Sequence, residues 1–185
     1  AIDLIMVYLA IEIVSISSFI LAGYLRGDLR SNEAALKYVI YGAFSSGIML
    51  FGLSIVFGLA GSTKFFAIQE AMWNLEGSAN FAFTLATVFI LAGFGYKISA
   101  VPFHYWTQDV YEGSHLSITA YLSVAPKAGA FALMIRFFNQ TFADGGAMSG
   151  VETVSATQFP WPELLSLLAV LTMTLGNLVA IQQMS

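Results

Sequence analysis

The sequence contains no cysteine and very little charge. Without cysteine it can form no disulfide, thiolate catalyst or iron–sulfur cluster, so we expect any electron transfer to take place in another protein. Only 10% of its residues are Asp, Glu, Lys or Arg, and together they give a net charge of −4. These charges are scattered and form no basic patch, so we expect no nucleic-acid partner. So little polar surface also argues against a soluble globule.

The sequence is instead rich in apolar residues. They make up 58% of the 185 residues, and the mean hydropathy is +0.78. A bilayer core takes about 20 apolar residues per helix, so this length allows about five crossings. We therefore predict an all-α, multi-pass transmembrane helix bundle that contacts the lipid bilayer. Its helices are expected at about residues 2–24, 32–60, 79–106, 116–138 and 161–182.

Three polar stretches separate the expected spans. Residues 61–78, which include Trp73, are expected to form an interfacial loop, and residues 109–114 and 139–158 two further loops. Basic residues gather around the turn at 24–32, which we place in the cytoplasm. No polar tail follows the last apolar run, so we expect the chain to be a piece of a longer one.

Three ionisable residues interrupt the apolar runs, namely Glu12, Lys97 and Lys127. A charge at the centre of a bilayer costs on the order of 3 kcal/mol, so a residue kept there usually serves a function. The alternatives are a structural ion pair inside the bundle, or lysines whose amines reach back to the membrane surface. Lys127 is midway along its expected helix and too deep to reach the surface easily. We regard all three as candidate functional residues.

Carboxyl and amine side chains suit proton movement. Burial raises the pKa of a carboxyl group and lowers that of an amine, which brings both toward neutral pH and lets each gain and lose a proton. We expect the charge of Glu12 to influence Lys97. His104, whose imidazole ordinarily has a pKa of about 6.5, is a candidate relay beside Lys97. Neither His104 nor His115 has a partner at metal-ligand spacing, so we predict no metal site.

Two prolines fall inside expected helices. Each lacks a backbone donor and frees a carbonyl one turn earlier, at Ile98 for Pro102 and at Leu122 for Pro126. We therefore predict a broken helix near Lys97 to Pro102. Non-helical backbone at membrane depth persists only where protein or water meets it, so hydrated cavities are expected beside the lysines. The alternative is a packing kink whose carbonyl accepts a hydrogen bond from a neighbouring hydroxyl.

The segment 95–127 carries two distinctive runs, Asp-Val-Tyr-Glu-Gly at 109–113 and Ser-Val-Ala-Pro-Lys at 123–127. Together with Asn-Glu-Ala-Ala-Leu-Lys-Tyr at 32–38, they resemble the antiporter-like subunits of respiratory complex I. Among these subunits the N subunit is the most similar, since its L and M relatives usually carry histidine near Lys127. The resemblance covers essentially the whole chain.

This resemblance implies that residues 1–185 are a partial antiporter-like proton-translocation domain, similar to the family's fifth through ninth transmembrane helices. Glu12 then matches the glutamate of the fifth helix, Lys97 the lysine of the broken seventh and Lys127 that of the eighth, which line the family's proposed proton path. The family's activity is proton translocation by NADH:quinone oxidoreductase, driven by quinone reduction elsewhere in the complex.

The resemblance also implies where the redox chemistry and the partners lie. This chain is expected to hold no cofactor, while FMN, iron–sulfur clusters and quinone belong to partner subunits. The expected partners are the other membrane subunits of complex I, both antiporter-like and small. The expected location is the bacterial plasma membrane.

Two other interpretations stay open. A subunit of a multisubunit sodium/proton antiporter or of a membrane-bound hydrogenase would share these helices and buried charges, although Lys127 in place of histidine argues against it. A non-transporting structural scaffold would use the Glu12 and Lys97 pair only to fasten helices together.

Overall fold

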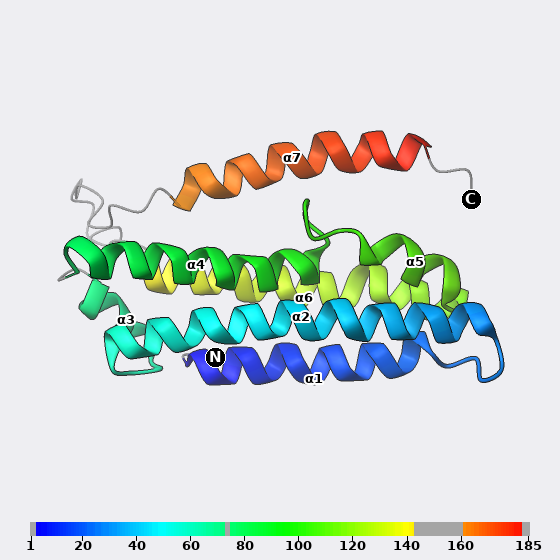
Figure 1. Ribbon diagram of the computed structural model, residues 1–185, viewed down its shortest axis with the longest axis horizontal. Helices are drawn as coiled ribbons and strands as arrows, with labels where there is room; N and C mark the ends of the chain where they lie inside the picture. Colours follow the sequence, from blue (N-terminus) through cyan, green and yellow to red (C-terminus); the bar gives the residue numbers. More distant parts are fainter. Residues whose placement is uncertain (1–2, 73–74, 143–160, 183–185) are drawn as a thin grey trace.

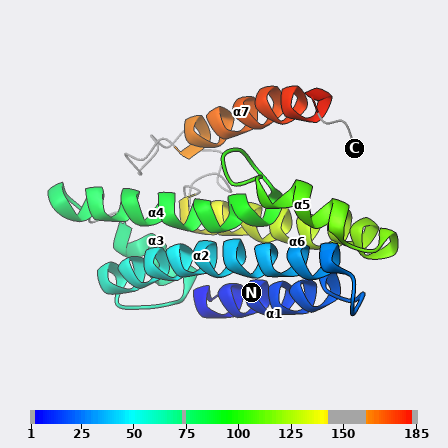
Figure 2. The same cartoon turned by 45° about the vertical axis from the view of Figure 1, so that its right-hand side comes forward.

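The computed structural model describes residues 3–72, 75–142 and 161–182. Within these ranges the chain folds into seven helices and no strand, with an isolated bridge between Asp3 and Lys64. The helices are α1 (Leu4–Ala22), α2 (Leu29–Ala60), α3 (Phe65–Met72), α4 (Gly77–Ile98), α5 (Trp106–Gly113), α6 (Leu116–Phe142) and α7 (Trp161–Gln182). The long helices run alongside one another in a flat bundle, and α7 lies along one side of it (Figure 1, Figure 2).

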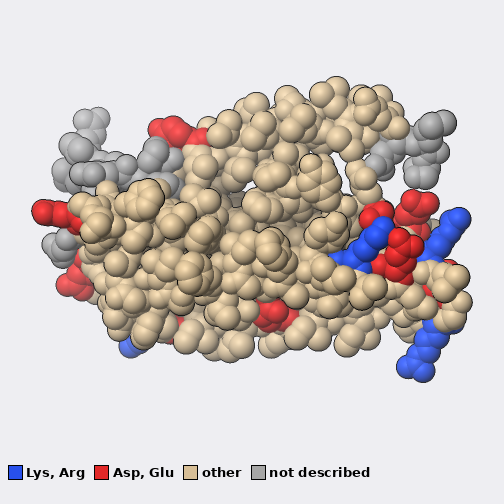
Figure 3. Space-filling model, in the orientation of Figure 1, with Lys and Arg blue, Asp and Glu red and all other residues tan. Residues whose placement is uncertain are grey.

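Five of the described helices, α1, α2, α4, α6 and α7, are long and apolar enough to cross a membrane. Large apolar side chains such as Ile13 and Phe44 stand exposed on the outer faces of α1 and α2, at 66% and 71% of their full area. On the face drawn in Figure 3, charged side chains gather mainly at the two ends of the bundle, with an apolar band between them. Such a band matches the hydrocarbon core of a bilayer, and the predicted all-α membrane bundle is confirmed.

The first helix begins at a cap that also ties it to the far end of α2. The Asp3 side chain accepts a hydrogen bond from the Ile5 backbone N–H at 2.9 Å and another from the Thr63 hydroxyl at 2.6 Å. The Thr63 bond leads the effects that lower the pKa of the Asp3 carboxyl below its usual value. Because Thr63 follows α2, one carboxylate both starts α1 and fastens the α1–α2 pair.

Small residues let the central helices α2 and α4 approach closely. A Cβ added at Gly52 would lie 2.7 Å from the Ala86 carbonyl oxygen, and one at Gly93 would lie 2.5 Å from the Met49 sulfur. Only glycine fits at these two contacts. The close approach brings Tyr96 of α4 against α2, where its buried side chain defines the second of two core clusters.

Two of the predicted loops contain helices. Within 61–78, α3 buries Phe65, Ile68 and Met72 against the main core, and the i, i+3, i+7 spacing of these residues is that of one helix face. Within 109–114, α5 buries Val110 in the same way. The prediction of plain loops is wrong there because a short buried helix needs only two or three apolar residues.

The third predicted loop, 139–158, lies only partly within the described residues. Its first four residues, 139–142, continue α6 to Phe142, while 143–158 lie outside the described residues, as does Trp73 of the expected interfacial loop. The helix continues because Phe138, Thr141 and Phe142 are buried against neighbouring helices.

The predicted broken helix near Lys97 to Pro102 is confirmed. Helix α4 ends at Ile98, and Ser99 adopts the left-handed conformation with φ of 60°. The Ser99 and Ala100 backbone N–H groups bond back to Tyr96 and Gly95 carbonyls at 3.2 and 2.8 Å. The helix has therefore closed at Ile98, four residues before Pro102, which has no N–H to bond the Ile98 carbonyl. A turn then leads to α5.

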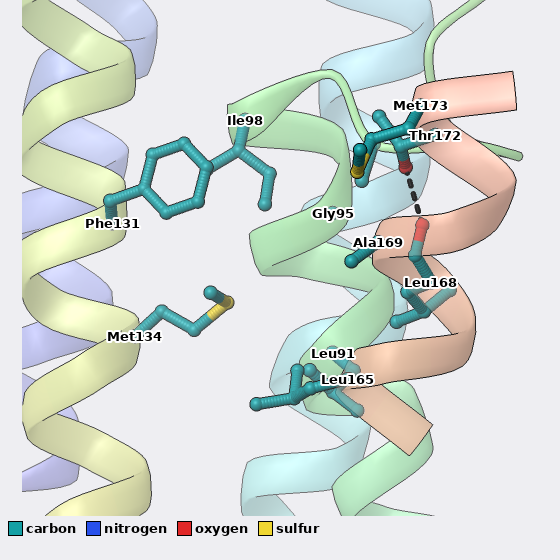
Figure 4. Close-up of a pocket in the computed structure, with 11 residues that line it drawn as sticks. Leu91, Gly95, Ile98, Phe131, Met134, Leu165, Leu168, Ala169, Thr172 and Met173 are labelled. Atoms are coloured by element: carbon teal, nitrogen blue, oxygen red, sulfur yellow. Dashed lines mark hydrogen bonds between the residues drawn. The ribbon is translucent and has the colours of Figure 1, made fainter. Parts of the chain in front are cut away.

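Helix α7 is the least attached of the described helices. None of its residues is buried. The Val101 backbone N–H, in the turn after α4, donates a hydrogen bond to the Thr172 hydroxyl of α7 at 3.0 Å. Figure 4 shows the apolar cavity of about 400 Å³ between α7, α4 and α6, lined by side chains such as Leu91, Phe131 and Leu168.

Candidate functional site

Lys97 occupies the last turn of α4, immediately before the break. Its side chain is 5% exposed, and its Nζ has no hydrogen-bond partner among the described residues. The ammonium lies 5.6 Å from the Phe19 ring centroid and 5.7 Å from that of Tyr96. The negative faces of these rings attract the cation but offer it no lone pair to bond. The close contact between α2 and α4 thus holds the Lys97 amine in a place where no described group accepts a hydrogen bond from it.

A cavity of about 170 Å³ opens beside Lys97, between α1, α4 and α6. Its wall includes Pro126 and Gly129 of α6 and Val14 of α1. The volume is large enough for several water molecules, and the lysine amine supplies a polar group for them. Lys97 of α4 and Pro126 of α6 therefore line the same cavity.

Glu12 of α1 is half-buried and accepts a hydrogen bond from the Ser46 hydroxyl of α2. The part of the chain that the structure describes contains no ion pair between Glu12 and Lys97. An electrostatic influence of Glu12 on Lys97 without direct contact stays a prediction. The scaffold interpretation loses the ion pair on which it depended.

Lys127 follows Pro126 in the middle of α6 and faces the other way, toward α5. Its Nζ lies 5.2 Å from the ring centroid of Tyr111. The Tyr111 hydroxyl in turn donates to the Leu122 carbonyl at 3.4 Å. Leu122 is the residue whose carbonyl Pro126 deprives of its helical partner. One tyrosine therefore contacts the lysine and also satisfies the carbonyl that the proline leaves open.

His104 lies in the turn between α4 and α5, where its ring stacks on Tyr105 with centroids 4.6 Å apart. Its Nδ1 is buried and has no hydrogen-bond partner among the described residues. It lines a cavity of about 520 Å³ together with Lys127, Thr107 and Glu112, and this cavity extends to α7. The sequence suggested a place beside Lys97, whereas the structure puts His104 on the cavity of Lys127.

Three of the four candidates therefore line two different cavities, and the fourth lines neither. Lys97 lies on one cavity with Pro126, Lys127 and His104 lie on the other, and Glu12 stands apart at the α1–α2 contact. The adjacent residues Pro126 and Lys127 separate the two cavities. Where the structure describes the chain, no three His, Asp or Glu side chains are grouped to hold a metal ion.

An ion-pair network fixes α5, the second half of the broken helix. Lys37 of α2 pairs with Glu33 at 2.8 Å and with Asp109 of α5 at 2.9 Å. Trp106 of α5 stacks on Tyr38 with ring centroids 4.5 Å apart and donates its indole N–H to the Tyr96 carbonyl at 2.9 Å. These contacts set the position of Tyr111 one turn further along α5.

Sequence reasoning missed two partners in this site, Ser46 and Tyr111. Serine and tyrosine are ordinary in apolar helices, and no charge or periodicity marks either. Tyr111 lies inside the run at 109–113 that carries the family resemblance, which was its sole signal.

A membrane bundle in which a broken helix is flanked by lysines on two internal cavities belongs to the class of antiporter-like transport proteins. A family model described as "NADH:quinone oxidoreductase/Mrp antiporter, TM" matches residues 1–185. The chain belongs to this family.

Named relatives agree with this assignment. The chain is 50% identical over 181 residues to NADH-quinone oxidoreductase subunit N 2 of Chloroherpeton thalassium, covering 98% of this chain and 34% of that protein. It is 48% identical to NADH-quinone oxidoreductase subunit N of Chlorobium chlorochromatii, with 98% and 34% covered. The chain thus spans about a third of the length of these curated relatives, and the resemblance to N subunits is confirmed.

Solved structures share the fold. A chain of respiratory complex I from Thermus thermophilus with bound aureothin superposes with a TM-score of 0.74 at 31% identity, covering 99% of this chain and 35% of that one. A chain of the Mrp complex from Dietzia sp. gives a TM-score of 0.73 at 22% identity, covering 98% and 31%. The second likeness concerns the fold alone.

Proposed function

We propose that the chain is part of a proton-translocating membrane subunit of NADH:quinone oxidoreductase, respiratory complex I. The observation that carries this proposal is Lys97, a buried amine at the end of a broken membrane helix and beside a cavity, with no hydrogen-bond partner among the described residues. Relatives near 50% identity that are named as subunits of this enzyme support it. Glu12, Lys97 and Lys127 are the proposed proton path, and His104 is a proposed relay.

The chemistry asked of this chain is reversible protonation. A buried lysine is stabilised as a cation by the carbonyl end of its helix and by ring faces, and destabilised by the loss of water. Because these opposing effects are large, a modest change in a nearby charge decides whether the amine keeps its proton. Glu12 supplies such a charge for Lys97 without bonding to it. Lys127 receives its support from the ring face of Tyr111 on α5.

Partners provide the energy in this proposal. Quinone reduction takes place in other subunits, where FMN, iron–sulfur clusters and quinone belong, and the sequence of this chain offers no cysteine for such a cluster. Other antiporter-like subunits and small membrane subunits are the proposed neighbours. Since the relatives compared are bacterial, we propose the bacterial plasma membrane as the location.

A sodium/proton antiporter subunit is the second candidate function, because the matching family includes Mrp antiporters. The difference in identity favours complex I, at 50% for the subunit N relative against 22% for the Mrp chain. Lys127, where histidine is usual in those relatives, points the same way.

Mass spectrometry of the complex purified through this chain separates the two. Co-purification of flavin and iron–sulfur subunits is the expected result, and an assembly of antiporter subunits alone would refute the complex I assignment. Lys97→Ala in the same complex should abolish proton pumping through this subunit, while assembly remains intact.

A further inference from the structure

The cavity that Lys127 lines and a second, charged cavity share one carboxylate in their walls. The charged cavity, of about 230 Å³, lies between the start of α2 and the end of α5 and is lined by Arg30, Glu33, Lys37 and Asp109. Glu112, in the last turn of α5, lines this cavity and also the larger one with Lys127. Among the described residues, the other carboxylates of the charged cavity do not reach the Lys127 side.

Glu112 forms no ion pair with its charged neighbours among the described residues. Lys37 instead holds both Glu33 and Asp109 in ion pairs. A carboxylate that is not committed to a lysine can bind a proton and release it again, which a paired carboxylate does less readily. Glu112 is also exposed, so water reaches it directly.

We infer that Glu112 is the uptake carboxylate of this subunit, taking a proton from the aqueous charged cavity and passing it into the cavity of Lys127. This inference rests on the proposed proton-translocating function. A proton from water forms the O–H bond of the Glu112 carboxyl group. The same proton then leaves to water in the larger cavity or to the Lys127 amine, and the carboxylate is restored. No oxidant or reductant takes part.

Charged groups line both cavities around Glu112. They are Arg30, Glu33 and Lys37 on α2, Asp109 on α5, His104 in the turn before α5 and Lys127 on α6. The turn before α2, which the sequence places in the cytoplasm, is beside the charged cavity, so uptake from the cytoplasm follows.

The test compares Glu112→Gln, Glu112→Asp and Glu163→Gln in the complete reconstituted complex, with proton pumping and quinone turnover measured together. Glu163, an exposed carboxylate of α7, lines neither cavity and is the control. We expect Glu112→Gln to slow pumping by at least about tenfold, as for loss of a positioned proton-transfer group. Glu112→Asp should retain most activity, and Glu163→Gln should match the wild type. Wild-type pumping by Glu112→Gln, or equal loss in Glu163→Gln, would overturn the inference.

A chemical rescue guards against a merely structural effect. The Glu112→Cys variant, treated with iodoacetate, regains a carboxylate, whereas iodoacetamide adds a neutral amide of similar size. Recovery of pumping with iodoacetate alone supports the inference, and recovery with both reagents or neither contradicts it, with treated wild-type complex as the control. The Lys127→Ala variant distinguishes failure of the proposed proton-translocating function from failure of the uptake role of Glu112. If it pumps normally, the proposed function fails, whereas loss in Lys127→Ala with normal pumping in Glu112→Gln sinks the uptake role alone.

Discussion

The Tyr111 hydroxyl donates a hydrogen bond across two helices to the Leu122 carbonyl, at 3.4 Å. Leu122 is four residues before Pro126, so its carbonyl has no helical N–H to bind. The proline site of α6 and the position of α5 are therefore coupled through one side chain, whose ring centroid also lies 5.2 Å from the Lys127 ammonium.

Tyr111→Phe should destabilise the protein by about 1 kcal/mol, the low end for a buried acceptor that loses its partner, because the bond is long. In the Pro126→Ala background the alanine N–H satisfies the Leu122 carbonyl, so the same Tyr111→Phe change should cost almost nothing. A double-mutant cycle of unfolding in detergent measures the difference. Equal losses in both backgrounds would show that the hydroxyl does not serve the proline kink.

Lys97→Arg should impair proton pumping nearly as badly as Lys97→Ala. Arginine stays charged because its guanidinium pKa exceeds about 12, so it cannot release a proton. Pumping and quinone turnover are measured in reconstituted complex, after assembly has been verified for both variants. Near-normal pumping by the arginine variant would leave Lys97 as a fixed charge and remove it from the proton path.

Glu12→Gln should lower pumping while the complex still assembles. Glutamine keeps the size and the acceptor for the Ser46 hydroxyl but loses the charge that we propose acts on Lys97. Ser46→Ala is the matched control, since it removes the hydrogen bond and keeps the charge, and it should pump nearly as the wild type does. The opposite ranking of these two variants would make the contact structural.

Asp3→Asn should reduce stability at neutral pH, and this loss should shrink as the pH falls below about 3.9. The hydrogen bond from Thr63 keeps the pKa of Asp3 low in the folded state. The carboxylate therefore adds stability above its unfolded pKa of about 3.9 and loses that contribution as the pH falls through the folded value. Asparagine retains the helix cap, so the expected difference is below about 1 kcal/mol for this surface site. Thermal unfolding between pH 3 and pH 7 measures it, and a loss independent of pH would assign the effect to capping alone.

The membrane spans could be predicted because lipid imposes one simple condition, a long apolar helix. That condition is absent from α3 and α5. Their few buried residues, such as Ile68 and Val110, become meaningful only when the neighbouring helices are in place. Both were read as loops for that reason.

For the candidate site too, the sequence predicts some features and misses others. Glu12, Lys97 and Lys127 stand out because a charge in an apolar run is rare. Their surroundings depend on how each helix is rotated about its own axis, which sequence spacing within one helix does not determine. The separation of Lys97 and Lys127 onto two cavities therefore became visible only in three dimensions.

The hydrogen bond from Val101 to Thr172 has a mechanical consequence. The Val101 N–H is a buried donor in the turn that separates α4 from α5, and its described acceptor belongs to α7. Moving α7 away would leave that donor unpaired, at about 1–3 kcal/mol. A displacement of α7 would therefore pull on the turn beside Lys97 through this hydrogen bond.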